Sequence, residues 1–318
     1  MSHSLSQSSH RLISKLATPK LQTEGGGFLV RKVIGTVIPN CDPILMLDHI
    51  GPVVYKPGEA LGAPDHPHRG FETVTYLIDG GVKHQDSAGN KGILKPGWVQ
   101  WMTAGKGVVH SEMPTDDIME NGGKSEGFQL WVNLPAKFKM IEPRYQDTPP
   151  EKIPIVKTED NRVTIKVISG ECRGVNAVIE TKIPITMLDI HLEAGSTFTY
   201  TIPTSHNGFC YVWRGAGFLG HNQMPAHMGQ VGLLSETGSE FMIRAEDGQD
   251  CHALLIAGKP IKEPIVNYGP FVMNTQEEIL QAIEDYRAGK LGQIPGEAER
   301  LRQTEAAQAL HKKNKNNS

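Results

Sequence analysis

The sequence predicts an all-β protein built from two β-barrels in tandem. Glycine (34 residues) and proline (21 residues) recur between short runs of Val, Ile, Thr, Tyr and Trp. Turn residues spaced around short apolar segments are typical of a β-sandwich or β-barrel. The rhythm of strands and glycines in the first half returns in the second, where residues 211–215 match the place of residues 76–80. At 318 residues the chain is long enough for two cores of ordinary size.

The first half, residues 1–140, is expected to form the first barrel. Its clearest strand candidates are rich in β-branched and aromatic residues and cover 73–78, 92–94, 99–102 and 128–132. A linker or covering loop is expected over residues 141–160. This segment contains Pro143, Pro149 and Pro150, and proline cannot donate a hydrogen bond to a sheet.

The second half, residues 161–295, is expected to form the second barrel. Its strand candidates cover 163–169, 185–192, 209–214, 231–234, 241–244 and 252–257. A helix is predicted near residues 275–288, because Thr275 and Glu278 have the spacing of a capping box. Ile279, Ile283 and Tyr286 then form an apolar stripe, which we expect to pack on a barrel. Residues 296–318 are expected to be a flexible tail.

Composition argues against several classes of protein. The net charge of −3, with 21% charged residues, creates no overall field that would attract nucleic acid or a membrane surface. The apolar runs have the length of strands and are too short to span a membrane. Cys41, Cys172, Cys210 and Cys251 are scattered, which predicts buried free thiols in a reducing compartment. The first twenty residues weakly resemble a transit peptide and are better explained as a frayed terminus.

Two pairs of candidate metal ligands stand at the ends of one apolar, glycine-containing stretch. His66 and His68 open it, and His110 and Glu112 close it. Side chains two residues apart on a strand point to the same face, so each pair can direct two donors at one point. Three imidazoles and a carboxylate suit Fe, Mn, Ni, Cu or Zn, whereas Ca and Mg prefer shells of oxygen alone. The pattern therefore predicts a metal site in the first barrel.

Three segments around these ligands resemble the pirin family, whose members are bicupins with two jelly-roll β-barrels in tandem. The segments are His-Pro-His-Arg-Gly-Phe-Glu-Thr-Val-Thr-Tyr at 66–76, Gly-Trp-Val-Gln-Trp-Met-Thr-Ala-Gly at 97–105 and Gly-Val-Val-His-Ser-Glu-Met-Pro at 107–114. The resemblance is dense over residues 30–135 and continues more thinly to about residue 290. It implies two cupin domains followed by a short C-terminal helix.

The resemblance also implies the metal and its ligands. His66, His68, His110 and Glu112 would hold one ferrous iron, Fe(2+), per chain in the N-terminal barrel. Glu72 falls where other cupins often place a carboxylate ligand, and here a structural or supporting role is expected for it. The C-terminal barrel would be metal-free. Its histidines are accordingly expected to be ordinary surface or core residues, namely His191, His206, His221, His227 and His252.

The activity that the resemblance implies is that of quercetin 2,3-dioxygenase, also called flavonol 2,4-dioxygenase. The ring of a flavonol-like aromatic molecule is opened by dioxygen with loss of carbon monoxide. Glu112 would serve both as ligand and as the general base that accepts a phenolic proton. Apolar residues near the ligands either form a cavity wall for the flat substrate or belong to the barrel core, namely Leu61, Phe71, Trp101, Met102 and Val109.

A second hypothesis is a redox-responsive transcriptional co-regulator. The resemblance implies that a change in iron oxidation state would alter a surface that binds a transcription factor or signalling protein, without direct contact to nucleic acid. A local basic face near the first barrel is either part of such a surface or simply solvated, namely Lys83, His84, Lys91, Lys95 and Lys106. A third possibility is that the barrel binds iron for stability or acts as a protein-interaction scaffold. The chain is expected to be a monomer in the cytoplasm, with the nucleus as a second candidate compartment.

Overall fold

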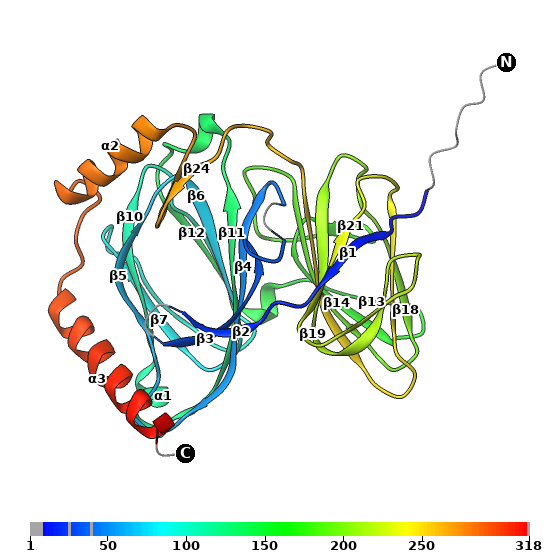
Figure 1. Ribbon diagram of the computed structural model, residues 1–318, viewed down its shortest axis with the longest axis horizontal. Helices are drawn as coiled ribbons and strands as arrows, with labels where there is room; N and C mark the ends of the chain where they lie inside the picture. Colours follow the sequence, from blue (N-terminus) through cyan, green and yellow to red (C-terminus); the bar gives the residue numbers. More distant parts are fainter. Residues whose placement is uncertain (1–8, 25–26, 39–40, 317–318) are drawn as a thin grey trace. The chain divides into compact units, whose positions relative to one another are not determined.

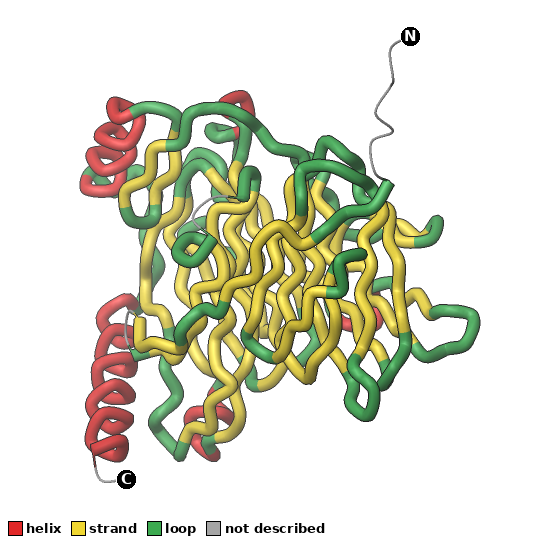
Figure 2. The backbone as a smooth tube through the Cα atoms, turned by 45° about the vertical axis from the view of Figure 1, so that its right-hand side comes forward, coloured by secondary structure: helices red, strands yellow, loops and turns green. Residues whose placement is uncertain are grey.

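The computed structural model of the chain describes residues 9–24, 27–38 and 41–316. Strands dominate it (Figure 2), which confirms the all-β prediction. The four cysteines all lie in the described part, and each is buried with a free thiol, as expected. No helix among the described residues combines the length and the apolar character needed to cross a membrane.

The strands belong to two compact units, each assembled from separate parts of the chain. We call the first the histidine unit; it contains residues 21–32, 45–150 and 261–318. The second unit contains residues 1–20, 33–44 and 151–260. These units differ from the two consecutive barrels predicted at 1–140 and 161–295, because each unit includes a segment from the other half of the chain. Residues near the N-terminus complete the second unit, and residues after 260 complete the histidine unit.

Two antiparallel sheets form the barrel of the histidine unit (Figure 1). The larger has seven strands in the order β12 (Arg144–Thr148), β9 (Val99–Thr103), β6 (Phe71–Asp79), β11 (Gly123–Asn133), β4 (Ile44–Tyr55), β3 (Phe28–Ile34) and β2 (Leu21–Glu24). The smaller has four strands in the order β5 (Ala63–His68), β10 (Val108–Pro114), β7 (Val82–Asp86) and β8 (Lys91–Leu94). Strand β12 lies within the segment 141–160, which was expected to be a linker or covering loop.

Two C-terminal helices cover the histidine unit. Helix α2 (Gln276–Arg287) begins at the predicted capping box, with reciprocal hydrogen bonds between Thr275 and Glu278. Ile279 is fully buried in a cluster with Val109 and Phe271, so the predicted stripe packs on a barrel, and that barrel is in the histidine unit. A short hairpin, β24 (Val266–Tyr268) and β25 (Phe271–Met273), leads into α2.

Helix α3 (Glu297–Asn316) replaces the flexible tail expected over residues 296–318. It lies against β5 (Figure 1), and its Ala307 is buried with Tyr55, Ala60 and Leu61. The helix is polar over most of its surface, so its composition alone resembles that of a solvated tail. Packing and ion pairs with the barrel stabilise a helix that its own sequence signals weakly. A further helix, α1 (Asp116–Asn121), joins β10 to β11.

The second unit is a ten-stranded antiparallel arrangement. Its main path runs β1 (Ile13–Ala17), β21 (Gln230–Leu234), β19 (Asn207–Leu219), β23 (Cys251–Gly258), β17 (Ile185–Leu192), β14 (Val163–Ser169) and β13 (Ile155–Lys157). Off this path lie β18 (Thr197–Thr201), β20 (Met224–His227) and β22 (Glu240–Ala245). The pair β15 (Glu171–Cys172) and β16 (Val175–Asn176) stands apart. In β14 Val163, Ile165 and Val167 are buried in alternation, which is the period expected of a strand with one face in the core.

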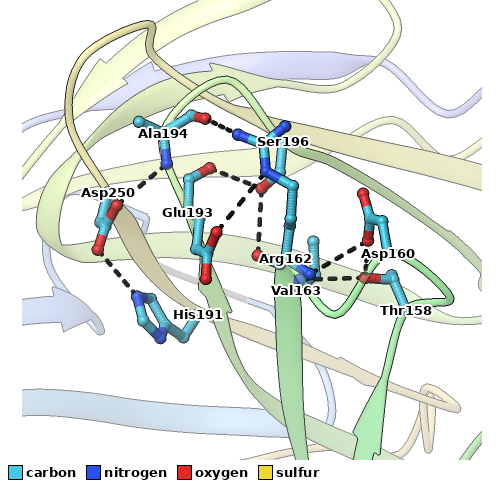
Figure 3. Close-up of polar contacts among 9 residues, drawn as sticks. All are labelled: Thr158, Asp160, Arg162, Val163, His191, Glu193, Ala194, Ser196 and Asp250. Atoms are coloured by element: carbon cyan, nitrogen blue, oxygen red, sulfur yellow. Dashed lines mark hydrogen bonds and ion pairs between the residues drawn. The ribbon is translucent and has the colours of Figure 1, made fainter.

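Polar contacts join three turns of the second unit (Figure 3). The Asp250 carboxylate accepts a hydrogen bond from the Ala194 amide at 3.0 Å and pairs with His191 Nε2 at 3.2 Å. The Arg162 guanidinium donates to the carbonyl of Ala194 and lies 3.6 Å from the Glu193 carboxylate. These contacts provide hydrogen-bond partners for backbone groups at the turns, where the strands end and the sheet no longer pairs them.

The N-terminal segment is fixed to the second unit by a buried arginine. Residues 1–8 of the expected frayed terminus lie outside the described residues. Strand β1, which follows them, pairs with β21, and Ala17 lies opposite Val231. The fully buried Arg11 donates to the carbonyls of Gly238, His206 and Pro203, at 2.9, 2.8 and 3.1 Å. Three charge-assisted bonds satisfy the guanidinium away from water, so the segment that leads into β1 is anchored here.

Candidate metal centre

The pairing of β5 with β10 brings the three predicted histidine ligands together. His66 and His68 point to one face of β5, and His110 on β10 lies opposite His66 in the register. One ring nitrogen from each of the three lies within 4.8 Å of the others. The ring centroids are 4.3 Å apart for His66 and His110, and 4.9 Å apart for the other two pairs. The two segments separated by some forty residues in sequence thus converge as the spacing predicted.

The surroundings of the three imidazoles suit a metal ion. His66 Nδ1 lies 2.8 Å from the carbonyl of Pro64, which selects the tautomer that leaves the Nε2 lone pair free. Burial lowers the pKa of His68 and of His110 well below its usual range, so both rings are neutral. His68 Nδ1 and both nitrogens of His110 are buried without a hydrogen-bond partner. Such orphaned nitrogens are costly, and a metal ion would satisfy one on each ring.

Glu112 lies on the same strand as His110 but outside the three-imidazole group. A shift of register between His110 and Glu112 places Glu112 opposite Ala63. Its Oε1 lies 3.0 Å from Thr75 Oγ1, which is also 2.8 Å from the Gln129 amide oxygen. A hydroxyl has one proton, and the charged carboxylate is the stronger acceptor. The role of Glu112 as fourth ligand therefore stays a prediction, with Thr75 holding its carboxylate from the opposite sheet.

Glu72 has a different environment. Its side chain is buried, and its Oε1 accepts a hydrogen bond of 2.6 Å from the Thr103 hydroxyl on the neighbouring strand β9. It belongs to no group of potential ligands among the described residues. These contacts support the expected structural role.

A cavity of about 610 Å³ lies inside the histidine unit and reaches the predicted metal ligands. His66, His68, Glu112 and Thr75 all line it. Most of its wall is apolar, with contributions from Phe28, Val30, Met46, Ile50, Leu61 and Trp131. The Trp131 ring lies 5.4 Å from the His68 ring between centroids, so an aromatic surface stands directly beside a predicted ligand.

The apolar residues expected to be either cavity wall or barrel core divide between the two alternatives. Leu61 lines the cavity, whereas four other candidates are buried and do not line it, namely Phe71, Trp101, Met102 and Val109. Sequence reasoning missed Thr75, Gln129 and Trp131. A signal existed: Gln129 and Trp131 alternate with buried apolar residues along β11, as residues that face a cavity do.

Charged side chains from β2, β3 and β4 also line the cavity. Lys32 and Glu24 form an ion pair of 3.5 Å. Burial raises the pKa of the nearby Asp48 carboxyl to about 6, with Lys32 acting to lower it and Glu24 to raise it. Asp48 Oδ1 is buried without a hydrogen-bond partner. The cavity therefore carries a carboxyl group that can pair with a hydroxyl of a bound molecule.

The predicted basic face is smaller than expected. His84 is buried and pairs with Asp147 at 3.0 Å, so it does not contribute to a surface. Lys83 and Lys106 form ion pairs with Asp116 and Glu142. These pairings agree with the solvated-surface alternative.

Of the five second-unit histidines expected to be ordinary surface or core residues, His221 belongs to a group of three potential metal ligands. Among the residues that the structure describes, His191, His206, His227 and His252 join no group of three potential ligands. His191 and His252 stack at 4.2 Å, and His191 pairs with Asp250 (Figure 3).

Comparison with known proteins identifies the family. The family model described as "Pirin" matches residues 27–132, and the model described as "Pirin C-terminal cupin domain" matches residues 187–292. A pirin-like protein of Solanum lycopersicum is 43% identical over 283 residues, covering 89% of this chain and 93% of that protein. The chain belongs to the pirin family. The predicted family is thereby confirmed, and the two all-β units are the two cupin domains of a pirin.

Two further pirin relatives have names that refer to an activity. A protein of Pseudomonas aeruginosa named "Putative quercetin 2,3-dioxygenase" is 41% identical over 290 residues, covering 89% of this chain and 98% of that protein. A crystal structure of quercetin 2,3-dioxygenase from Acinetobacter baumannii matches with a TM-score of 0.84 at 36% identity, covering 89% of this chain and 99% of that one. All four predicted metal ligands fall within the first matched segment, whereas α3 lies beyond residue 292, where the second match ends.

Proposed function

We propose that this pirin is an iron-dependent dioxygenase that opens the ring of a flavonol, consuming one dioxygen and releasing one carbon monoxide. The observation that carries the proposal is the cluster of three imidazoles on the wall of a largely apolar cavity of about 610 Å³. A cavity of this size suits a ligand of roughly drug size, which a flavonol is. The two relatives named for quercetin 2,3-dioxygenase support the same reaction.

His66, His68 and His110 would hold the metal through neutral imidazole nitrogens, with Glu112 as the fourth ligand. Imidazole suits iron, nickel, copper and zinc, so the donor set fits iron without selecting it. Ferrous iron, when bound, supplies a redox-active Lewis acid for chemistry with dioxygen. The orphaned nitrogens of His68 and His110 support this use of the site.

Glu112 would accept the proton of the reacting hydroxyl on one of its carboxylate oxygens. A general base must lie within hydrogen-bond reach of the proton that it removes, and Glu112 lines the cavity that would hold the substrate. The Thr75 hydroxyl, 3.0 Å from Oε1, orients the carboxylate. Because Thr75 stands on the opposite sheet, the base is held from both sides of the cavity.

The remaining wall would bind and orient the substrate. Flat rings would pack against Phe28, Leu61 and Trp131, which removes their apolar surface from water. Asp48 would pair with a hydroxyl group of the substrate, since its Oδ1 has no other hydrogen-bond partner. An apolar cavity with a few polar groups excludes bulk water while it fixes one orientation.

The test is the release of carbon monoxide and the uptake of oxygen by the iron-loaded protein supplied with quercetin. The variant Glu112→Gln keeps the size of the side chain but removes the base, so turnover should fall at least about 100-fold at equal iron content. Glu120→Gln is the matched control, because Glu120 is exposed on α1 outside the cavity. It should keep parental turnover.

An absence of carbon monoxide from fully iron-loaded protein would contradict the proposal. The alternative would then be a module that binds a transcription factor or another protein according to the oxidation state of its iron. Equal turnover in Glu112→Gln and in the parent would still support dioxygenase activity, but it would show that Glu112 is not the general base.

A further inference from the structure

A second cluster of potential metal ligands lies in the second unit. His10 precedes β1, His221 stands in the turn between β19 and β20, and Glu240 begins β22. One nitrogen or oxygen from each lies within 4.8 Å of the others. Some 200 residues separate His10 from its two partners in sequence, so no local spacing indicated this group.

The two imidazoles face one carboxylate oxygen. His221 Nε2 lies 3.0 Å from Glu240 Oε1, and His10 Nε2 lies 3.8 Å from the same atom. The two rings are stacked, with centroids 3.9 Å apart and planes inclined by 12°. Both Nε2 atoms are therefore presented on the same side of the pair, toward the carboxylate.

The Nε2 atom of His221 has no hydrogen-bond partner. Although it is 3.0 Å from Glu240 Oε1, it is buried without a hydrogen bond of acceptable direction. A buried nitrogen left in this state is destabilising unless something binds it. The side chains of His10 and Glu240 are about half exposed, at 51% and 47%, so an ion can reach the cluster from water.

The backbone around the cluster is already ordered. The amides of Ser239 and Glu240 both donate to the carbonyl of Ser9 at 2.9 Å, and the Arg11 amide donates to the carbonyl of Glu240 at 2.7 Å. Asn222, next to His221, bonds both backbone groups of Ile13 at 2.9 and 3.0 Å. Ligands held on a fixed frame lose little conformational entropy when they bind an ion.

We propose that His10, His221 and Glu240 form a second metal site, which binds a divalent ion of the zinc, nickel or copper type and ties the start of the chain to the second cupin domain. Two imidazoles and one carboxylate are the donors that such ions prefer, and they leave coordination positions for water. Calcium and magnesium fit poorly, because they prefer oxygen ligands. Family membership does not imply the site, since His10 lies outside both matched segments. The expectation of one metal per chain then becomes two.

The experiment isolates the second site by disabling the first. The double variant His68→Ala/His110→Ala, freed of metal by chelation, is titrated with Zn(II) in a calorimeter, with circular dichroism to verify its fold. One ion per chain should still bind. Adding His221→Ala or, as a conservative change, Glu240→Gln should weaken that binding more than about tenfold, since one of three ligands is lost. His227→Ala is the matched control, an exposed histidine of the same domain outside the cluster, and it should bind normally.

The intact parent chain gives an independent measurement. Saturating Zn(II) should raise its melting temperature through both sites, and Glu240→Gln should remove part of that rise. The proposal is overturned if the double variant binds no zinc, or if His221→Ala and Glu240→Gln bind it as tightly as His227→Ala does. Neither outcome bears on the proposed dioxygenase activity, which depends on other residues.

Discussion

The Arg300 guanidinium binds the Asp65 carboxylate through two hydrogen bonds, of 2.5 and 2.7 Å, and Asp65 is next to the predicted metal ligand His66 in sequence. Both side chains are less than a tenth exposed, at 9% and 5%. Arg300 also donates to the carbonyls of Pro295 and Ile294, at 2.8 and 3.1 Å. Helix α3, which lies beyond the matched pirin segments, is thereby tied to the strand that carries two of the three clustered histidines.

Replacing Arg300 should destabilise the protein strongly. Arg300→Gln leaves the Asp65 carboxylate buried without its partner, which costs about 3 to 5 kcal/mol for buried ion pairs. The control is Arg302→Gln on the same helix, because Arg302 makes only an exposed pair with Glu299. That change should cost less than about 1 kcal/mol. Urea unfolding of the two variants measures the difference, and equal values would mean that the pair contributes little.

Removing either buried histidine should remove most of the bound iron. In His68→Ala or His110→Ala the site loses a neutral imidazole, and the remaining donors hold a divalent ion poorly. Metal content after dialysis, determined by elemental analysis, checks the expectation. His227→Ala serves as control. Full iron occupancy in either variant would show that the ion is held elsewhere.

The Thr75 hydroxyl should matter for turnover more than for metal content. Thr75→Val keeps the shape of the side chain but removes the hydrogen bond to Glu112. A bond to a charged group is worth about 1.5 to 3 kcal/mol, so kcat with quercetin should fall by about 10- to 100-fold. Thr199→Val, on an exposed position of β18, is the control. A loss of iron in Thr75→Val would instead indicate that Thr75 acts by positioning a ligand.

Asp48 should make the protein less stable as the pH rises from about 4 to about 6. Its folded pKa of about 6 lies above the ordinary value of 3.8, so the folded state holds the proton more tightly than the unfolded state. The resulting stabilisation is complete below pH 3.8 and is lost as the pH rises through 6. The loss is at most about 3 kcal/mol, because each pKa unit corresponds to about 1.4 kcal/mol.

Asp48→Asn should remove this dependence, since the amide does not ionise. Urea unfolding of both proteins at several pH values between 4 and 7 gives the comparison. The variant should be the more stable protein at pH 7, and the difference should shrink toward pH 4. A constant difference over that range would contradict the raised pKa.

Local patterns in the sequence predicted the features that depend on neighbouring residues. The capping box at Thr275 and Glu278 predicted the start of α2. The two-residue spacing of His66 and His68 predicted that both lie on one face of a strand. These features follow from the periodicity of helices and strands, which acts over a few residues. The spacing of the two ligand pairs also predicted that His110 meets these histidines, which the register of β5 and β10 now explains.

Tertiary structure alone decided which distant segments meet. The sequence did not indicate that β1 completes the second unit, that α3 closes on β5, or that His10 meets Glu240. Arg300 and Asp65 are 235 residues apart, and neither has a neighbour that signals the other. Periodicity determines which face of a strand or helix is apolar, but any complementary face or strand edge satisfies that local pattern. The particular partner is selected by the burial and hydrogen bonding of the whole chain, which only the folded arrangement shows.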